Sequence, residues 1–290
     1  GTNPPSIVND IYPGINGSNP SWFAMFEEEL YFQADNGVDG SELWKYDGTN
    51  TPSMVADLNN GPGGSYPGEL TAFPQWPYLF FSCDRGSGME LCFYNSEGDF
   101  ASSFSISWDI NNPQGLIIFK NKMYFAASGE GLGNEMWQMS IDEGGIAEFE
   151  IFDIYSGSYS SYPIHFAIYQ DKLYFSAKGS AEEGYELWVY EGFDQPYLVV
   201  DLIPTEYAST NPTHLVVFNE QLFFRTGTST TGDVYAFDGI DFRQIEFYNN
   251  QGASTLNVVL GEELYFTTRS GGEGITLWKL ISPGTTITYN

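Results

Sequence analysis

The stretch that decides the fold reads Leu-Tyr-Phe-Gln-Ala at 30–34, then a loop rich in Gly and Asp, then Glu-Leu-Trp-Lys-Tyr-Asp-Gly at 42–48. The pattern recurs along the 290 residues, and each copy opens with Leu or Met followed by two aromatic residues. The copies begin at Leu30, Leu79, Met123, Leu173, Leu222 and Leu264. A repeat of 42 to 50 residues that contains only short strand-like segments is typical of a β-propeller blade.

Each repeat predicts four short β-strands, which in the first copy lie at 22–26, 30–34, 42–46 and 53–58. The uninterrupted apolar triplet Leu-Tyr-Phe differs from the alternation of a sheet with one wet face. It indicates strands that are covered on both faces, as they are between neighbouring blades. The sequence therefore predicts an all-β, six-bladed β-propeller of four-stranded antiparallel blades, forming one domain over 1–290, with repeats beginning near residues 1, 49, 99, 146, 194 and 241.

The two ends of the chain compete for one sheet edge. Ser6–Ile11 resembles a fourth strand that precedes any first strand, and it would close the ring by completing the last blade. The tail Gly284–Asn290 is also β-prone and falls where the last blade's own fourth strand belongs. A surplus strand can pair with a neighbouring molecule, head to tail. Because the first residues read as the middle of a repeat, we also expect the chain to be a piece of a longer protein.

The motif at 42–49, Glu-Leu-Trp-Lys-Tyr-Asp-Gly-Thr, resembles the ELWxxDGT repeat family. Ser18-Asn19-Pro20 and the Val-x-Asp-Ile segment at 8–11 match further parts of that family's pattern, and all six copies match it in part. The resemblance implies secreted or cell-surface proteins made of tandem β-repeats. It implies no shared enzymatic activity.

The charge of the chain limits its partners. Lys and Arg number 10 against 38 Asp and Glu, giving a formal net charge of −28. This excess argues against nucleic acid and against anionic membrane surfaces, and it favours cationic partners or divalent cations. No apolar run has the length of a membrane-spanning segment, so we expect no membrane insertion.

Two cysteines and one sequon point to an extracellular location. Cys83 and Cys92 lie on consecutive predicted strands, and equal steps from the loop centre place them directly opposite each other. They replace the Ala and Trp of other copies together, which predicts a disulfide and an oxidising compartment; the alternative is two buried thiols. Asn16-Gly17-Ser18 is an acceptor triplet for N-glycosylation.

The first strands contain the candidate binding residues. His165 and His214, the two histidines of the chain, hold the same place in consecutive repeats, where other copies have Trp22 and Glu69. Gly115 and Leu256 occupy the place in the remaining copies. Since first strands line the central channel of a propeller, these side chains would ring one level of it. They could form a ligand pocket, or they could simply fill the channel with polar groups.

Two further sets of side chains are candidates. The loop before Glu42 is rich in oxygen ligands, and Asp35, Asp39 and Glu42 could hold Ca²⁺, although their spacing differs from that of a twelve-residue calcium loop. The Glu of this motif recurs in the copies, and a repeated residue usually serves each blade. Tyr159, in a Ser- and Gly-rich loop, could stack on a sugar or contact a protein.

The search for catalytic motifs finds no Cys-x-x-Cys pair, no His-Glu-x-x-His, no phosphate-binding Gly loop and no Gly-x-Ser-x-Gly turn. We therefore expect a non-enzymatic, extracellular structural or adhesive module without a required cofactor. Its partner would be a second copy of itself in a head-to-tail filament, another extracellular protein or a glycan. The alternatives are a glycan-binding lectin-like propeller and a glycan-active enzyme with acidic residues at the mouth of the channel.

Overall fold

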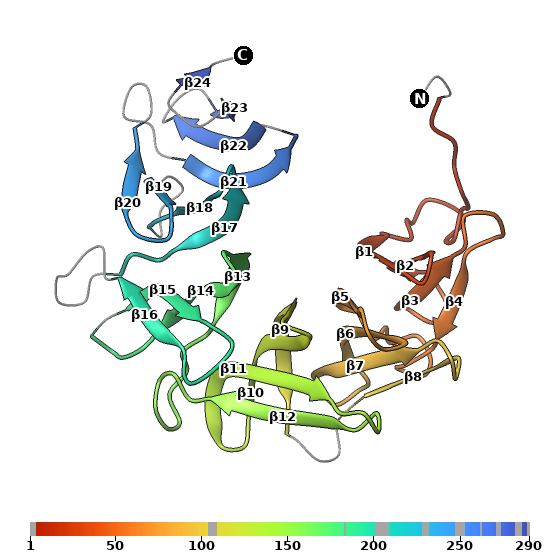
Figure 1. The fold of residues 1–290 in the computed structure, drawn as a ribbon. Helices are drawn as coiled ribbons and strands as arrows, with labels where there is room; N and C mark the ends of the chain where they lie inside the picture. The colour runs from red at the N-terminus through yellow and green to blue at the C-terminus, as the bar shows by residue number, and fades with distance from the viewer. Residues whose placement is uncertain are drawn as a thin grey trace. The chain divides into compact units, whose positions relative to one another are not determined.

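The chain forms six four-stranded antiparallel sheets in a computed structural model (Figure 1). The structure describes residues 4–103, 109–182, 184–200, 209–227, 232–246, 253–261, 263–270, 274–281 and 286–288. We call each sheet a blade. Every blade is built from strands that are consecutive in the chain and paired in chain order. Among the described residues, no helix is long and apolar enough to cross a membrane.

The strands have the following bounds. Blade 1 contains β1 (Ser21–Phe26), β2 (Glu29–Asp35), β3 (Ser41–Tyr46) and β4 (Ser53–Ala56). Blade 2 contains β5 (Gly68–Phe73), β6 (Tyr78–Asp84), β7 (Met89–Asn95) and β8 (Phe100–Ser103). Blade 3 contains β9 (Asn111–Phe119), β10 (Lys122–Gly129), β11 (Leu132–Ile141) and β12 (Ala147–Phe152). Blade 4 contains β13 (Ile164–Tyr169), β14 (Lys172–Lys178), β15 (Tyr185–Tyr190) and β16 (Tyr197–Val200). Blade 5 contains β17 (Thr213–Phe218), β18 (Gln221–Arg225), β19 (Val234–Phe237) and β20 (Phe242–Ile245). Blade 6 contains β21 (Ala253–Leu260), β22 (Glu263–Ser270), β23 (Gly274–Ile281) and β24 (Thr286–Thr288).

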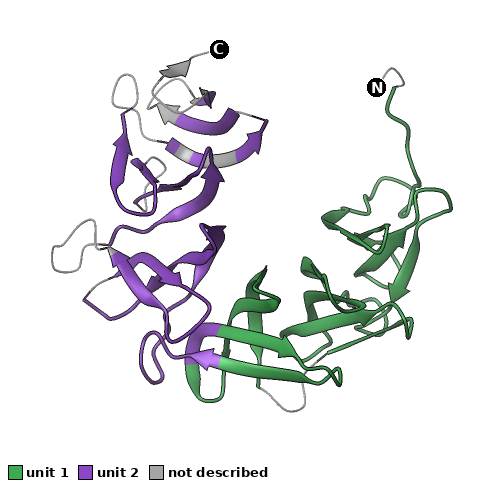
Figure 2. Cartoon of the chain, viewed as in Figure 1, with its two compact units in different colours: residues 1–132, 137–150 green, residues 133–136, 151–290 purple. Residues whose placement is uncertain are grey.

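The chain divides into two compact units (Figure 2). Unit 1 comprises 1–132 and 137–150, and unit 2 comprises 133–136 and 151–290. In unit 1 the first strand of each blade contacts the next one, β1 against β5 and β5 against β9. In unit 2 the first strands β13, β17 and β21 are neighbours in the same way.

In blades 2 to 5 the apolar triplet of the second strand is buried throughout, as predicted, whereas Leu30 of blade 1 and Tyr265 of blade 6 are only partly buried. In β6 the side chains of Leu79, Phe80 and Phe81 are fully buried, and those of Leu173 and Phe175 in β14 are buried equally well. Adjacent blades share these cores. One cluster, for example, joins residues of blades 1 and 2, and another joins blades 4 and 5. Apolar burial of this kind is the main favourable term for a β-fold with short strands.

Three of the linkers between blades are each held by a buried carboxylate from the third strand of the preceding blade. Glu42 of β3 accepts hydrogen bonds from the Leu58 amide (3.2 Å), the Ser65 amide (2.8 Å) and the Ser65 hydroxyl. Glu135 of β11 binds the Ser161 amide (2.8 Å) and hydroxyl (2.6 Å). The third carboxylate is that of Glu186 of β15, which accepts from the Thr210 amide (2.9 Å). We call this contact the latch.

The latch serine also binds its own blade. The Ser65 carbonyl accepts from the Asp84 amide (2.7 Å) at the end of β6, and the Ser161 carbonyl accepts from the Lys178 amide (2.9 Å) at the end of β14. One residue therefore connects the third strand of the preceding blade to the second strand of its own blade. Burial raises the pKa of Glu42 and Glu135, although the hydrogen bonds that their carboxylates accept oppose this shift.

The two ends of the chain differ from the prediction. The tail forms β24, which pairs with β23 and completes blade 6. The predicted strand Ser6–Ile11 is wrong: residues 4–10 contain no strand, and Ile7 and Val8 are 80% and 61% exposed. Blade 6 therefore takes its fourth strand, β24, from the tail, and all its strands come from the C-terminal part of the sequence.

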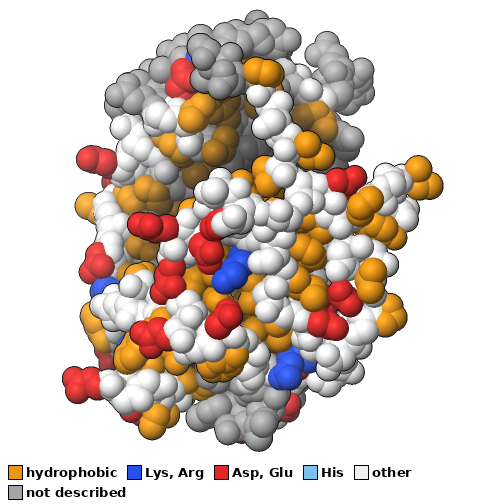
Figure 3. All heavy atoms as spheres, turned by 90° about the vertical axis from the view of Figure 1, so that its right-hand side faces the viewer, with side chains coloured by type: hydrophobic (Ala, Val, Ile, Leu, Met, Phe, Trp, Pro, Cys, Tyr) orange, Lys and Arg blue, Asp and Glu red, His pale blue; other side chains and the backbone are white. Residues whose placement is uncertain are grey.

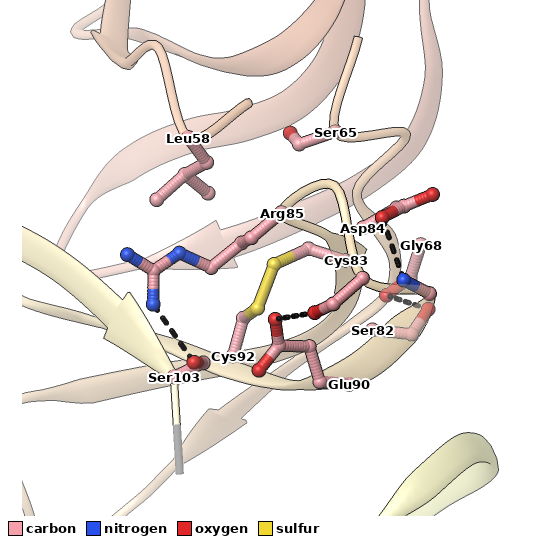
Figure 4. Close-up of a disulfide and its surroundings, with 12 residues drawn as sticks. Leu58, Ser65, Gly68, Ser82, Cys83, Asp84, Arg85, Glu90, Cys92 and Ser103 are labelled. Atoms are coloured by element: carbon pink, nitrogen blue, oxygen red, sulfur yellow. Dashed lines mark hydrogen bonds between the residues drawn. A yellow bond between two sulfur atoms is a disulfide. The ribbon is translucent and has the colours of Figure 1, made fainter. Parts of the chain in front are cut away.

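The predicted disulfide between Cys83 and Cys92 is confirmed (Figure 4). Both cysteines are fully buried, and Leu58 of the linker from blade 1 belongs to the same apolar cluster. The two residues are diagonal rather than directly opposite, because Cys83 pairs with Glu90 while Cys92 pairs with Phe81. The hairpin loop is centred one residue earlier in the chain than the midpoint between Cys83 and Cys92. The Cα atoms of the two cysteines still lie 5.9 Å apart, which suits a disulfide.

The surface is acidic without one concentrated patch in the view of Figure 3. Acidic side chains are scattered over that face among apolar and uncharged ones, and basic side chains are few. This distribution agrees with the net charge of −28.

The two cysteines of the disulfide occupy positions where other blades have an alanine and a tryptophan. In blade 3, Trp137 donates from its indole Nε1 to the Ala127 carbonyl (3.0 Å). We expect C83S/C92S to lower the free energy of unfolding by about 3 kcal/mol, as for a short disulfide loop. C83A/C92W should recover most of this loss, because it restores the Ala–Trp pair. Guanidinium unfolding measures both variants, and unchanged stability of C83S/C92S would contradict a stabilising role for the disulfide.

Candidate functional site

The four candidate residues of the first strands occupy the same structural position. Trp22, Glu69, His165 and His214 are each the second residue of β1, β5, β13 and β17. Their φ angles lie between 54° and 59°, in the left-handed region that side chains other than glycine seldom adopt. The strand pairing shifts register at this point in each of the four blades.

This bulge is a property of the blade and not of one residue type. Bulges re-aim side chains, and they recur next to binding sites. Since the backbone is shared and the residue differs from blade to blade, the side chain at this position is free to carry function. Gly115 also has a positive φ, of 69°, but lies at the fifth residue of the longer β9. The side chain of Leu256 lies outside the described residues.

In unit 1 the side chains at this position reach the first strand of the next blade. The indole of Trp22 lies over Gly68, where an added Cβ would come within 3.5 Å of Nε1. The Glu69 carboxylate accepts a hydrogen bond from the Leu116 amide (3.0 Å). Trp22 remains 52% exposed, so unit 1 offers an aromatic surface but a carboxylate that is already engaged.

In unit 2 the same position brings the two histidines together. The imidazole rings of His165 and His214 stack with their centroids 5.7 Å apart and their planes 19° apart. Both side chains are half-buried. Burial lowers the pKa of both histidines. A neighbouring positive charge lowers each pKa further: that of His214 acts on His165, and that of Arg225 acts on His214. At neutral pH both imidazoles are therefore uncharged and able to accept a proton.

Two features distinguish this pair. The Nδ1 atom of His214 is buried and has no hydrogen-bond partner among the described residues, and such atoms usually find a water molecule or a ligand. A fixed positive charge also stands beside the pair. Arg225 of β18 is buried, and its guanidinium Nε donates to the Ala253 carbonyl (2.8 Å) while Nη1 approaches Thr213 Oγ1 (3.5 Å).

The sequence reading missed Arg225. The signal was present, because Arg225 stands where the other copies of the Leu-aromatic-Phe pattern have Gln33, Ser82, Ala126, Ser176 and Thr267. Arg225 is thus the one charged residue among the six at this repeat position. His165, His214 and Arg225 together form what we call the imidazole site.

The structure does not assemble a calcium site from Asp35, Asp39 and Glu42. Glu42 is fully buried in its latch. Asp35 Oδ1 accepts from the Gly37 amide (2.6 Å), and Asp39 Oδ2 accepts from the Asn36 side chain (2.8 Å), so both oxygens stabilise the turn. Over the described ranges, no group of three or more His, Cys, Asp and Glu side chains is arranged to hold a metal ion.

The remaining candidates lie on loops. Tyr159 is 62% exposed and stacks on Tyr155 with the ring centroids 4.8 Å apart. Asn16 is exposed, and its amide donates to the Tyr12 hydroxyl (3.0 Å). Its glycosylation stays a prediction.

Comparison with known proteins identifies the fold but not the family. No family model matches the chain, and no curated protein matches its sequence. The extracellular domain of a proposed one-component system from B. thetaiotaomicron superposes with a TM-score of 0.60 and 14% identity, covering 97% of this chain and 34% of that one. The β-propeller domain of the Trilobed protease from Pyrococcus furiosus gives 0.56 and 12%, covering 94% and 85%. An oligogalacturonate lyase in complex with manganese gives 0.55 and 13%, covering 88% and 71%.

These likenesses support the six sheets as blades of a β-propeller. They also correct the function predicted from the sequence. The chain resembles propellers that belong to a protease and a lyase, so the prediction of a non-enzymatic adhesive module, assembled into filaments by strand addition, is wrong.

The imidazole site makes a direct prediction about titration. By NMR, both histidines should titrate with pKa values below 6.5, and H214A should raise the pKa of His165 because it removes a neighbouring charge and opens the site to water. R225Q should raise the pKa of His214, because it removes the neighbouring positive charge of Arg225. Histidines that titrate at or above 6.5 in the wild type would show that the two rings do not stack in a half-buried site.

Proposed function

We propose that the protein is a glycan-active enzyme that cleaves uronate-containing oligosaccharides by elimination at the imidazole site. The observation that carries the proposal is the stack of His165 on His214 beside Arg225. The only two histidines of a chain with net charge −28 meet in one half-buried place with a buried cation.

Elimination needs a base that is neutral at working pH and a positive charge that stabilises an anion. One imidazole takes the proton from the carbon next to the uronate carboxylate. The electrons of that C–H bond form the C4=C5 double bond, the C4–O4 bond breaks, and the leaving oxygen takes up a proton. A base with a lowered pKa is ready for this step, and a nearby guanidinium stabilises the charge that develops on the carboxylate.

The carboxylates of the latches and the Glu69 carboxylate fit hydrolysis less well. Hydrolysis of glycosides uses two carboxyl groups that flank the scissile bond. Glu42, Glu135 and Glu186 are fully buried and bind linker amides, and Glu69 binds the Leu116 amide. Elimination by imidazole therefore replaces the acidic channel mouth considered from the sequence. The name of one similar structure, an oligogalacturonate lyase, agrees with this substrate class.

We also propose that the protein acts outside the cell. The buried disulfide and the resemblance to the ELWxxDGT family support the location.

The activity is tested by incubating the purified protein with tri- and tetragalacturonate and following the ultraviolet absorbance of the unsaturated product. We expect H165A and H214A each to lower kcat/KM by about 100-fold or more, the range for loss of a general base. In the wild type kcat/KM should fall on acidification below pH 6.5, because the base becomes protonated. E148Q, on the exposed outer strand β12, is the matched control and should keep the wild-type rate.

Two results would contradict the proposal. One is the absence of unsaturated product from every uronate oligosaccharide tested. The other is full activity in both histidine variants. Cleavage of peptides in place of oligosaccharides would count against it in the same way.

A further inference from the structure

We infer that Tyr155, Tyr159 and Lys178 form a sugar-binding subsite that holds one uronate residue of the substrate, where the loop that leads into β13 meets the end of β14. This inference rests on the proposed function for its substrate class. The loop runs from the end of β12 at Phe152 to the start of β13 at Ile164, and His165 is the next residue. All three side chains of the subsite belong to unit 2.

The geometry is that of an exposed aromatic platform. The rings of Tyr155 and Tyr159 are nearly parallel, with an interplanar angle of 15° and centroids 4.8 Å apart. Tyr159 is 62% exposed and Tyr155 is half-buried beneath it. The ammonium of Lys178 lies 5.7 Å from the centroid of the Tyr155 ring. A flat apolar surface is thus paired with one cation.

The platform is held rigid by its loop. A Cβ added at Gly133 would lie 1.8 Å from the Tyr159 carbonyl oxygen, so only glycine allows β11 to approach the loop so closely. Ser160 Oγ accepts from the Asn134 amide (2.8 Å), and Ser161 is fixed in its latch to Glu135. Asp153 accepts from the Gly157 amide (3.1 Å). The exposed ring therefore loses little conformational freedom when it binds a ligand, which favours affinity.

Blade 2 lacks this combination. The equivalent loop of blade 2 also carries an exposed tyrosine, Tyr66, at 57%. The position of Lys178 is taken there by Asp84, and no stacked ring faces Tyr66 among the described ring contacts. The aromatic pair and the lysine coincide in the same blade that carries His165.

The chemistry matches a uronate pyranose. Its apolar C–H face can pack on the exposed ring of Tyr159, which keeps its own polar hydroxyl in water. Its carboxylate can bind the Lys178 ammonium, which lies over the neighbouring Tyr155 ring. An oligosaccharide bound here would carry both an apolar and a charge-dependent contribution to its affinity.

The test uses tetragalacturonate as the probe and the H165A/H214A protein as the background, so that binding is measured by calorimetry without turnover. We expect Y159A to weaken binding about tenfold, and K178Q to weaken it about fivefold at low salt and less at high salt. Y66A, a tyrosine of similar exposure in blade 2, is the matched control and should leave binding unchanged. Circular dichroism confirms that the variants are folded.

The outcomes separate the inference from the proposed function. Binding that depends on Tyr159 and Lys178 supports the subsite, whether or not the wild type forms an unsaturated product. Binding that Y159A and K178Q leave unchanged overturns the subsite while the imidazole site still stands. If tetragalacturonate does not bind at all, the substrate class is wrong and the subsite falls with it. Equal weakening by Y66A would show a non-specific aromatic effect and would overturn the subsite alone.

Discussion

The structure depends on a buried carboxylate that accepts the hydrogen bonds of a linker serine or threonine. Short β-sheets stacked face to face bury apolar side chains well, but each linker between them leaves amides that must be satisfied. Glu42 and Glu135 each accept hydrogen bonds from several of these donors. The carbonyl of the serine that each one binds accepts a hydrogen bond from an amide of the following blade. The Glu of the repeated motif is therefore a structural residue, which explains why it recurs.

Blade 2 shows what happens where this arrangement is incomplete. Its Glu90 contacts only Ser87 among the hydrogen bonds of the described residues (3.4 Å), and its Oε2 atom is buried without a partner. The linker that follows has Asn111 at the latch position, where blades 1 and 3 are followed by Ser65 and Ser161. The same blade carries the disulfide. The disulfide thus lies in the blade whose latch is not formed. The same blade also lacks the tryptophan that other blades have at the position of Cys92.

The sequence was sufficient for the six sheets, the dry second strands and the disulfide, because repeat length and apolar runs reflect burial directly. It was also sufficient to assign Trp22, His165 and His214 to one repeat position, since each precedes its Leu-aromatic-Phe strand by eight residues, whereas Glu69 precedes its strand by ten. It failed at Ser6–Ile11, because two β-prone segments competed for one edge and pattern alone does not rank them. Arg225 was overlooked because the sequence shows its departure from the other copies but not that its side chain is buried. The function of the latch was hidden because its two partners are separated by 23 residues in one blade and 26 in another.

Each blade thus combines a fixed framework with a few variable side chains. The latch and the core are fixed by packing and by buried hydrogen bonds, whereas the bulged residue of the first strand and the linker side chains vary from blade to blade. Amide hydrogen exchange in E135Q tests this division most directly. The account predicts that the Ser161 and Ile154 amides, which bind Glu135 in the wild type, lose protection selectively, while Tyr174 in the core of β14 and the same amides in an E148Q control stay protected. Unchanged protection of Ser161 and Ile154 in E135Q would contradict it.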